Sequence, residues 1–269
     1  MELQTKVDIG RAPFEIGPCE DVLLVGSCFA DGIGRRFREE GFPVMVNPYG
    51  TMYNPASVLH TIERYEGKPR TAFITLGTNH VYRLKETGEI VDNCEKRPQS
   101  LFQEEQLTIA ECADYLQQAV DVLRQRNPEV RVVFTVSPIR YRKYGYHESQ
   151  LSKATLLLAV QQVISLHPSP STLHYFPAYE IMMDELRDYR FYAPDMLHPS
   201  QQAVDYIWER LVDYCFSADA KAYLEEWRPL KQALAHKPFH PEAPEYQALM
   251  DKTMLKVAEL RKKYPTFAM

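Results

Sequence analysis

The sequence predicts an α/β protein, a three-layer α/β/α sandwich built on a five-stranded parallel sheet. Short apolar runs rich in β-branched residues alternate along the chain with longer segments that have helical spacing of apolar residues. This alternation is typical of parallel strands joined by right-handed helical crossovers, with helices on both faces. Small and polar residues directly follow four of the five apolar runs, which places them at the sheet edge where α/β proteins bind ligands.

The elements follow from these patterns in chain order. Five apolar runs predict the strands of the sheet, over residues 22–25, 43–47, 72–76, 131–136 and 173–176. Helical spacing predicts helices over residues 31–38, 55–65, 108–126, 149–166, 179–186 and 201–216. Alternation on both sides of a glycine-containing turn predicts a β-hairpin over residues 81–91.

Residues 218–269 differ in character from the rest of the chain. Apolar residues such as Trp227, Leu230 and Val257 are set among many Lys and Glu residues, and three prolines separate two helical stretches. We therefore expect one α/β domain over residues 1–217 and a helical C-terminal extension over 218–269. The extension would pack either on the sandwich or on another subunit. In the second case the protein would be a homo-oligomer.

Composition excludes several classes of function. The net charge of -5 over 269 residues implies no basic face for nucleic acid or an anionic membrane. Five scattered cysteines without metal-type pairing indicate a reducing compartment. The chain has neither a signal-peptide pattern nor an apolar run long enough to span a membrane, so we expect a cytoplasmic protein. We expect no metal and no cofactor, and the absence of a Gly-rich phosphate loop argues against a nucleotide-binding, flavodoxin-like domain.

A hydroxyl and a thiol stand at the end of the first predicted strand. Gly26 breaks the apolar run and allows a sharp turn, and Ser27 and Cys28 follow at once before helical spacing begins. The amino terminus of a helix supplies free N–H groups and partial positive charge, which favour an oxyanion or a thiolate. An ordinary strand-to-helix turn without chemistry is the alternative interpretation.

A carboxylate and an imidazole lie three residues apart near the end of the predicted sandwich. Asp195 and His198 occupy a proline-bounded loop before the last helix of the domain. The carboxylate can accept a hydrogen bond from one ring nitrogen and leave the other to act as a base. The alternative is a surface histidine beside a helix cap, since Ser200 could cap the following helix.

Further polar and small residues follow other predicted strands. Gly50 is the centre of a turn-rich loop, and Gly77-Thr78-Asn79 closes the third strand. The alternative interpretations are that Gly50 allows a tight turn and that the Asn79 side chain stabilises a turn. Both interpretations are compatible with a role in a site. His80 either faces the same site or stabilises the hairpin. Arg140 either contacts an anionic group of a substrate or pairs with a carboxylate.

These blocks in this order resemble the GSCFA family, named for the run Gly26-Ser27-Cys28-Phe29-Ala30, within the wider SGNH/GDSL hydrolase superfamily. The resemblance covers most of residues 21–216. It aligns Gly26-Ser27-Cys28 with the nucleophile block, Gly50 with the second block, Gly77-Thr78-Asn79 with the third and Asp195-Met196-Leu197-His198 with the fifth. The connection between Gly50 and Gly77 is shorter than in other family members, which carry a Trp and a His there, and this chain has no Trp in that region.

The resemblance implies acyl transfer from an ester. His198, oriented by Asp195, would take the proton of the nucleophile, and the backbone N–H groups of the nucleophile and Gly50 would hold the oxyanion together with the Asn79 amide. An alignment of Gly26-Ser27-Cys28 with the nucleophile block without a gap places Cys28 at the position of the nucleophile. An alignment shifted by one residue places Ser27 there instead. We expect an acyl esterase acting on a small-molecule or carbohydrate ester. An acyltransferase of the same fold and a catalytically silent binding module are the alternatives.

Overall fold

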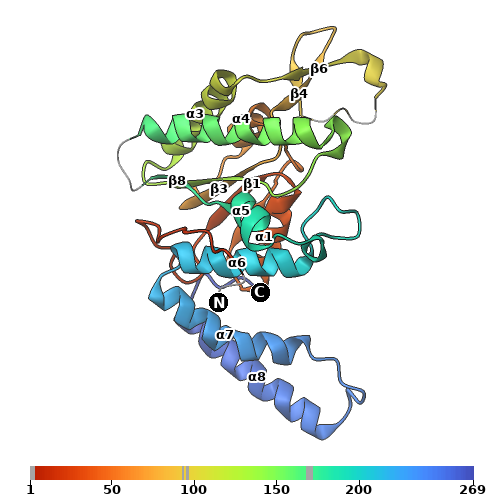
Figure 1. Ribbon diagram of the computed structural model, residues 1–269. Coiled ribbons are helices and arrows are strands. Elements are labelled where there is room, and N and C mark those ends of the chain that lie inside the picture. Colours follow the sequence, from red (N-terminus) through yellow and green to blue (C-terminus); the bar gives the residue numbers. More distant parts are fainter. Residues whose placement is uncertain (1–3, 93, 95–96, 168–171) are drawn as a thin grey trace.

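A five-stranded parallel sheet forms the centre of the computed structural model, which describes residues 4–92, 94, 97–167 and 172–269 (Figure 1). Its strand order is β2-β1-β3-β7-β8, and every neighbouring pair is parallel. The strands are β1 (Val22–Gly26), β2 (Val44–Val46), β3 (Thr71–Leu76), β7 (Arg131–Val136) and β8 (Leu173–Tyr175). The predicted fold class is thus confirmed, with the strand order of a doubly wound sheet.

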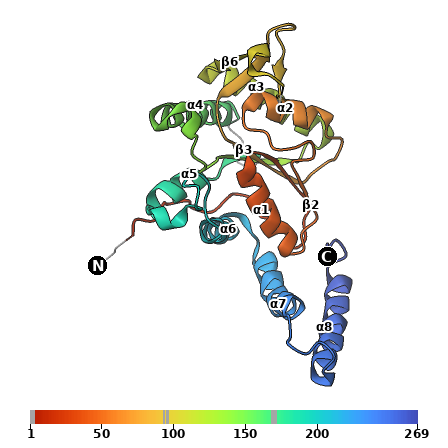
Figure 2. The ribbon, with the colours of Figure 1, turned by 90° about the vertical axis from the view of Figure 1, so that its right-hand side faces the viewer.

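Helices cover both faces of this sheet, as its fully buried central strands β1 and β3 require. On one face α1 (Cys28–Glu39) and α6 (Gln201–Cys215) pack on Val22, Leu24 and Phe73, together with residues 178–186. On the other face α2, α3 and α4 pack on Leu23, Val25 and Ile74 (Figure 2). These three helices are α2 (Pro55–Arg64), α3 (Ile109–Arg126) and α4 (Tyr146–Ser165). Alternate residues of β1 therefore serve opposite layers of the sandwich.

Helix boundaries follow local capping chemistry. The Ser27 side chain caps α1, Asn54 caps α2 and Thr108 forms a capping box with Glu111 at α3. The segment expected as a helix over 179–186 is instead a short α-helical turn, α5 (Ala178–Glu180), followed by a π-helical segment, η3 (Ile181–Glu185). Short 3₁₀ turns occupy Gln99–Leu101, Arg142–Tyr144 and Tyr189–Phe191.

A small antiparallel sheet projects from the carboxyl end of β3. It contains β4 (His80–Leu84), β5 (Ile90–Val91) and β6 (Phe102–Gln106) in the order β5-β4-β6. The hairpin expected over 81–91 is present, whereas β6 was not predicted. Strand β6 lies at the edge of this sheet, and only its residue Phe102 is buried. Its other residues are the polar Gln103, Glu104, Glu105 and Gln106, so the strand lacks the apolar signal of a core strand.

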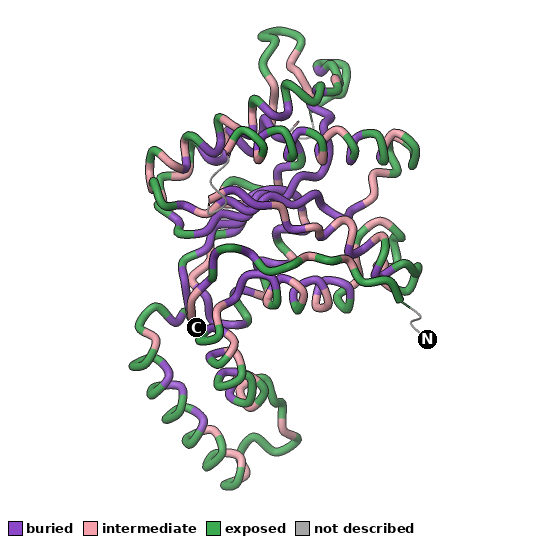
Figure 3. The backbone as a smooth tube through the Cα atoms, turned by 60° about the vertical axis from the view of Figure 1, so that its left-hand side comes forward, coloured by how far each residue is buried: buried purple, intermediate pink, exposed green. Residues whose placement is uncertain are grey.

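The C-terminal residues form two packed helices, α7 (Ala218–Ala235) and α8 (Pro244–Lys263), which extend away from the sandwich (Figure 2). The tube coloured by burial shows that much of both helices is exposed (Figure 3). Their base is anchored to the turn after α1: the hydroxyl of Tyr223 donates to Glu40 O at 2.5 Å, the indole of Trp227 donates to Glu39 O at 2.9 Å, and Ala268 N donates to Gly41 O at 2.9 Å. The extension therefore shares part of the core of the sandwich.

Among the described residues, no helix combines the length and the apolar composition needed to cross a membrane.

Candidate active site

The turn after β1 depends on a glycine. Gly26 has φ of +139°, and a Cβ at this position would lie 2.0 Å from the backbone oxygen of Thr75. This close approach allows Ser27 N to donate to Thr75 O at 3.0 Å, which continues the pairing of β1 with β3 into the turn. Any other residue would push β1 away from β3 and displace the start of α1.

Ser27 and Cys28 have different environments. The Ser27 side chain is fully buried; its Oγ lies 3.1 Å from Thr75 Oγ1 and accepts a hydrogen bond from Phe29 N at 3.3 Å. Cys28 is the first residue of α1 and is partly exposed. The serine is thus occupied as a helix cap, while the thiol lies at the helix amino terminus within reach of solvent.

The Cys28 thiol is protonated at neutral pH. Burial raises its pKa to about 11, and the carboxylates of Asp31 and Asp195 add to the increase, whereas its own backbone N–H and the Lys153 ammonium oppose it. The contribution of Asp195 indicates that the carboxylate of the Asp195 loop lies within electrostatic range of the thiol. A thiol in this state needs a base at the moment of attack.

Asp195 and His198 form a preassembled pair. His198 Nδ1 lies 2.5 Å from Asp195 Oδ2, while Asp195 Oδ1 accepts from the backbone N–H groups of Leu197 at 2.9 Å and His198 at 3.0 Å. These backbone hydrogen bonds, followed by the bond to the imidazole, lower the pKa of Asp195 to about 2. Met196 takes φ of +61° to close this turn. Nε2 of His198 makes no hydrogen bond within the described residues and is free to exchange a proton.

Arg140 supports the Asp195 loop. Its Nη1 donates to Met196 O at 3.1 Å, and its backbone N donates to Leu197 O at 3.1 Å. The guanidinium lies 4.1 Å from the ring centroid of Tyr146 and 5.3 Å from that of Tyr192. No carboxylate among the described residues forms an ion pair with Arg140, so one of the two sequence-based expectations, pairing with a carboxylate, is wrong: the guanidinium bonds to backbone instead. Contact of Arg140 with an anionic substrate group stays a prediction.

Two of the expected oxyanion donors are engaged elsewhere. The N–H of Gly50 donates to Asn47 O at 2.9 Å within an exposed turn where Gly50 has φ of +97°. The amide Nδ2 of Asn79 donates to Leu107 O at 2.7 Å and so ties the β3–β4 turn to the start of α3. Gly77 lies against the hydroxyl of Tyr141, and its N–H donates to Tyr53 O at 2.8 Å. Of the three expected donors, this leaves the N–H of Cys28, at the first position of α1.

A buried lysine that sequence analysis did not identify holds two of the loops together. Lys153, on α4, is 2% exposed and donates through Nζ to Gly77 O at 2.6 Å and Ser137 O at 2.7 Å, the residues that directly follow β3 and β7. Burial lowers its pKa to about 7. Ser152, beside it, bonds to Thr78 and to Asn79 N. The position of Lys153 on the apolar face of α4, three residues before Leu156, is the sequence signal that could have revealed it.

A pocket of about 400 Å³ lies where β4 meets the loops after β2 and β7. We call it the tyrosine pocket, and its lining includes Tyr53, Tyr82, Tyr141, Tyr144, His80 and Asn54. The rings of His80 and Tyr144 are stacked with centroids 3.7 Å apart, so His80 belongs both to the hairpin and to this pocket.

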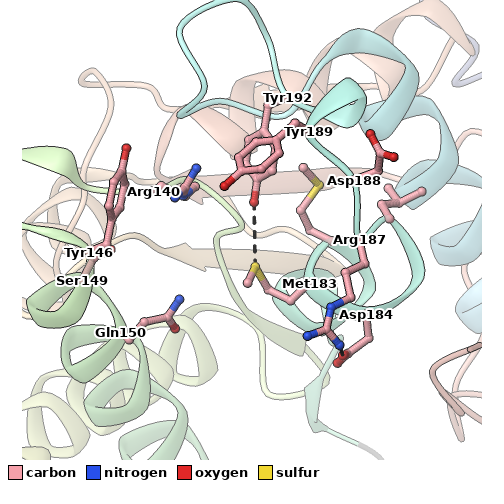
Figure 4. Close-up of a pocket in the computed structure, with 12 residues that line it drawn as sticks. Arg140, Tyr146, Ser149, Gln150, Met183, Asp184, Arg187, Asp188, Tyr189 and Tyr192 are labelled. Atoms are coloured by element: carbon pink, nitrogen blue, oxygen red, sulfur yellow. Dashed lines mark hydrogen bonds and ion pairs between the residues drawn. The ribbon is translucent and has the colours of Figure 1, made fainter.

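A second cavity, of about 360 Å³, has Arg140 in its lining (Figure 4). Met182 and Met183 of η3 line it together with Tyr189 and Tyr192, and the Tyr192 hydroxyl lies 3.8 Å from Met183 Sδ. Within the part of the chain that the structure describes, no group of three His, Cys, Asp or Glu side chains could hold a metal ion.

Three of the solved structures to which this chain is similar are carbohydrate esterases of low sequence identity. A carbohydrate esterase family 3 protein from Talaromyces cellulolyticus is 12% identical, with a TM-score of 0.45 over 71% of this chain and 94% of that one. The acetyl xylan esterase Est2A from Butyrivibrio proteoclasticus is 9% identical, with a TM-score of 0.44 over 74% and 64%. A family two carbohydrate esterase from Clostridium thermocellum is 11% identical, with a TM-score of 0.43 over 73% and 63%. At these values the likeness says nothing about the substrate of this chain.

Family models identify the chain directly. No curated protein sequence matches it. The model of the GSCFA family matches residues 21–73 and 67–211, which include the Gly26 turn and the Asp195 loop, and the model of the GSCFA C-terminal domain matches residues 227–269. The chain therefore belongs to the GSCFA family.

Proposed function

We propose that this protein is an ester hydrolase in which Cys28 is the nucleophile, His198 the general base and Asp195 the residue that orients the base. The observation that carries the proposal is the contrast at the end of β1. The Ser27 hydroxyl is buried and bonded to Thr75, whereas the Cys28 thiol is partly exposed. The Asp195–His198 pair, with Nε2 free, supplies the base that a protonated thiol requires.

The reaction would proceed in two balanced steps. Nε2 of His198 takes the thiol proton as Sγ attacks the ester carbonyl, and the oxyanion forms near the N–H of Cys28. The carbon–oxygen bond to the alcohol then breaks, and the alcohol leaves with the proton from His198. Water, deprotonated by the same nitrogen, attacks the thioester; the acid is released and the proton returns to Sγ.

The raised pKa of Cys28 favours this general-base mechanism over a resting ion pair of thiolate and imidazolium. With a pKa of about 11, the free thiol holds its proton through the neutral range. Asp195 stays ionised far below neutral pH, because its pKa is about 2, and so it can stabilise the imidazolium that forms during attack.

The test compares Cys28→Ala with Ser27→Ala on p-nitrophenyl acetate, with thermal unfolding of each variant as the control for folding. We expect Cys28→Ala and His198→Ala each to abolish turnover, and the double variant to lose little more, because the two groups act as a unit. Ser27→Ala should lower stability by about 1 kcal/mol through loss of the helix cap and keep much of the activity.

Mass spectrometry during turnover should find the acyl group on the peptide that contains Cys28. Turnover by Cys28→Ala equal to that of the wild type would refute the assignment of Cys28 as the nucleophile. A wild-type rate no faster than hydrolysis in buffer alone would refute the hydrolase and leave a catalytically silent binding module as the better account. Transfer of the acyl group to an added alcohol in preference to water would assign the same site to an acyltransferase.

A further inference from the structure

We propose that the tyrosine pocket binds the alcohol part of the ester and that this part is a neutral ring carrying several hydroxyl groups, such as a sugar. The inference rests on the proposed function, because it names the substrate class of the same site. It also assigns a role to the small antiparallel sheet, whose strand β4 supplies His80 and Tyr82 to the pocket wall.

The pocket adjoins the proposed nucleophile. Tyr53 comes from the loop after β2 and Tyr141 from the loop after β7, and their rings meet edge to face with centroids 6.1 Å apart. The loop that carries Tyr53 lies against the turn that carries Cys28, because Met52 N, next to Tyr53, donates to Gly26 O at 2.8 Å. A ligand in the pocket can therefore present a substituent to Cys28 without crossing the sheet edge.

The surfaces of the pocket suit a ring. The stacked pair of His80 and Tyr144, with planes 10° apart, is a flat and fixed aromatic wall. Aromatic rings combine a large apolar surface with a polar edge, which matches a sugar ring, with its apolar C–H face and its polar rim. A volume of about 400 Å³ lies within the range of small-ligand pockets.

Unpaired polar groups converge on the same space. Asn54 uses Oδ1 to cap α2 at Ser57 N, which leaves its Nδ2 without a partner among the residues described. Within that same set the hydroxyls of Tyr53 and Tyr141 make no hydrogen bond, and the Tyr141 hydroxyl is buried against Gly77. The ring of His80 makes none either, and its Nδ1 lies 3.6 Å from a carboxylate oxygen of Glu104. A ligand rich in hydroxyl groups would satisfy such donors and acceptors, whereas an alkyl chain would leave them unpaired at a cost in affinity.

The charges around the pocket are already neutralised. Asp92 is held by His60 Nδ1 at 2.7 Å and by Arg64 Nη2 at 3.0 Å, and Lys143 pairs with Glu104 at 3.0 Å. Burial lowers the pKa of His80, so its ring is neutral at neutral pH. The lining residues that the structure describes thus offer no uncommitted cation, which disfavours a phosphate or carboxylate ligand and favours a neutral one.

The test measures equilibrium binding by calorimetry to the Cys28→Ala protein, so that no ester is consumed. The two ligands are an O-acetylated methyl glycoside and cyclohexyl acetate, which has a ring of similar size without hydroxyl groups. The pocket variants are Tyr53→Phe, which removes only a hydroxyl, and Asn54→Asp, which keeps the helix cap and removes the Nδ2 donor. Tyr49→Phe is the matched control, because that hydroxyl lies on the same loop but donates to Arg64 O at 2.8 Å.

We expect the glycoside to bind at least about tenfold more tightly than cyclohexyl acetate, the value of one net hydrogen bond. Tyr53→Phe and Asn54→Asp should each weaken glycoside binding by a similar factor and leave cyclohexyl acetate unaffected, while Tyr49→Phe changes neither. The inference would be overturned if the glycoside bound no more tightly than cyclohexyl acetate, or if its binding could not be detected. It would also be overturned if Tyr53→Phe and Tyr49→Phe weakened glycoside binding equally. Failure of the proposed function would be seen separately, as ester turnover by Cys28→Ala.

Discussion

The buried Lys153 should make the stability of this protein depend on pH in a way that one substitution removes. Its ammonium donates to two backbone carbonyls, and no carboxylate forms an ion pair with it in the described part of the chain. Burial disfavours the charged form and lowers its pKa from 10.5 to about 7. Between these two pH values the folded state binds fewer protons than the unfolded chain, so the free energy of unfolding should rise with pH.

The size of this effect follows from the two pKa values. From pH 7 to pH 9 the folded protein loses its remaining proton at Lys153, while most unfolded chains keep theirs. Linkage then gives a gain of about 2 kcal/mol in the free energy of unfolding over these two pH units. Lys153→Met has no proton to lose and should lack this gain, although it leaves Gly77 O and Ser137 O without their donor.

Urea unfolding of wild type and Lys153→Met at pH 7, 8 and 9 measures the difference directly. Ser152→Ala is the matched control: it removes hydrogen bonds from the neighbouring residue of α4 to one of the two loops, the one after β3, but introduces no change in titration. Its stability should be lower than that of the wild type by a constant amount at all three pH values. If the curves of Lys153→Met and wild type run parallel, the lysine has an ordinary pKa and the argument from burial is refuted.

Three further changes have definite expected outcomes. Gly26→Ala should destabilise the fold by more than about 3 kcal/mol, or prevent folding, because its Cβ would overlap the backbone of Thr75; circular dichroism and urea unfolding would show this. Tyr141→Phe removes a buried hydroxyl with no partner in the described structure and should leave the melting temperature unchanged or raise it, so a clear drop would reveal a hidden hydrogen bond. Truncation after residue 217 removes Phe267 and its neighbours from the core near Phe42 and should yield aggregated protein, whereas a monodisperse, folded fragment would show that the extension is dispensable.

Local sequence patterns were sufficient to predict the sheet and the two central motifs. The central strands β1, β3 and β7 are almost fully buried and have few polar residues to obscure their apolar runs. The helices between successive strands favour a parallel arrangement. Gly26 marks the turn because no other residue tolerates its conformation. Asp195 and His198 are three residues apart, so the turn that joins them is itself a local structure.

Tertiary structure decided what these patterns left open. Ser27 and Cys28 are adjacent in the sequence, and only the hydrogen bond of Ser27 to Thr75 on the neighbouring strand shows which side chain is buried. Gly50 and Asn79 match a motif, yet the Gly50 N–H bonds to Asn47 within its own turn. The Asn79 amide bonds to Leu107, a contact that no local pattern encodes.

The elements that support the site were also decided by the tertiary structure. Lys153 is one of many lysines in the sequence, and its burial follows from where α4 crosses the carboxyl ends of β3 and β7. The edge strand β6 has a polar sequence and pairs with β4 because the chain returns beside it. Periodicity and residue type report on an element and its own burial, whereas the partners of a side chain depend on elements far away in the chain, and these are known only once the chain has folded.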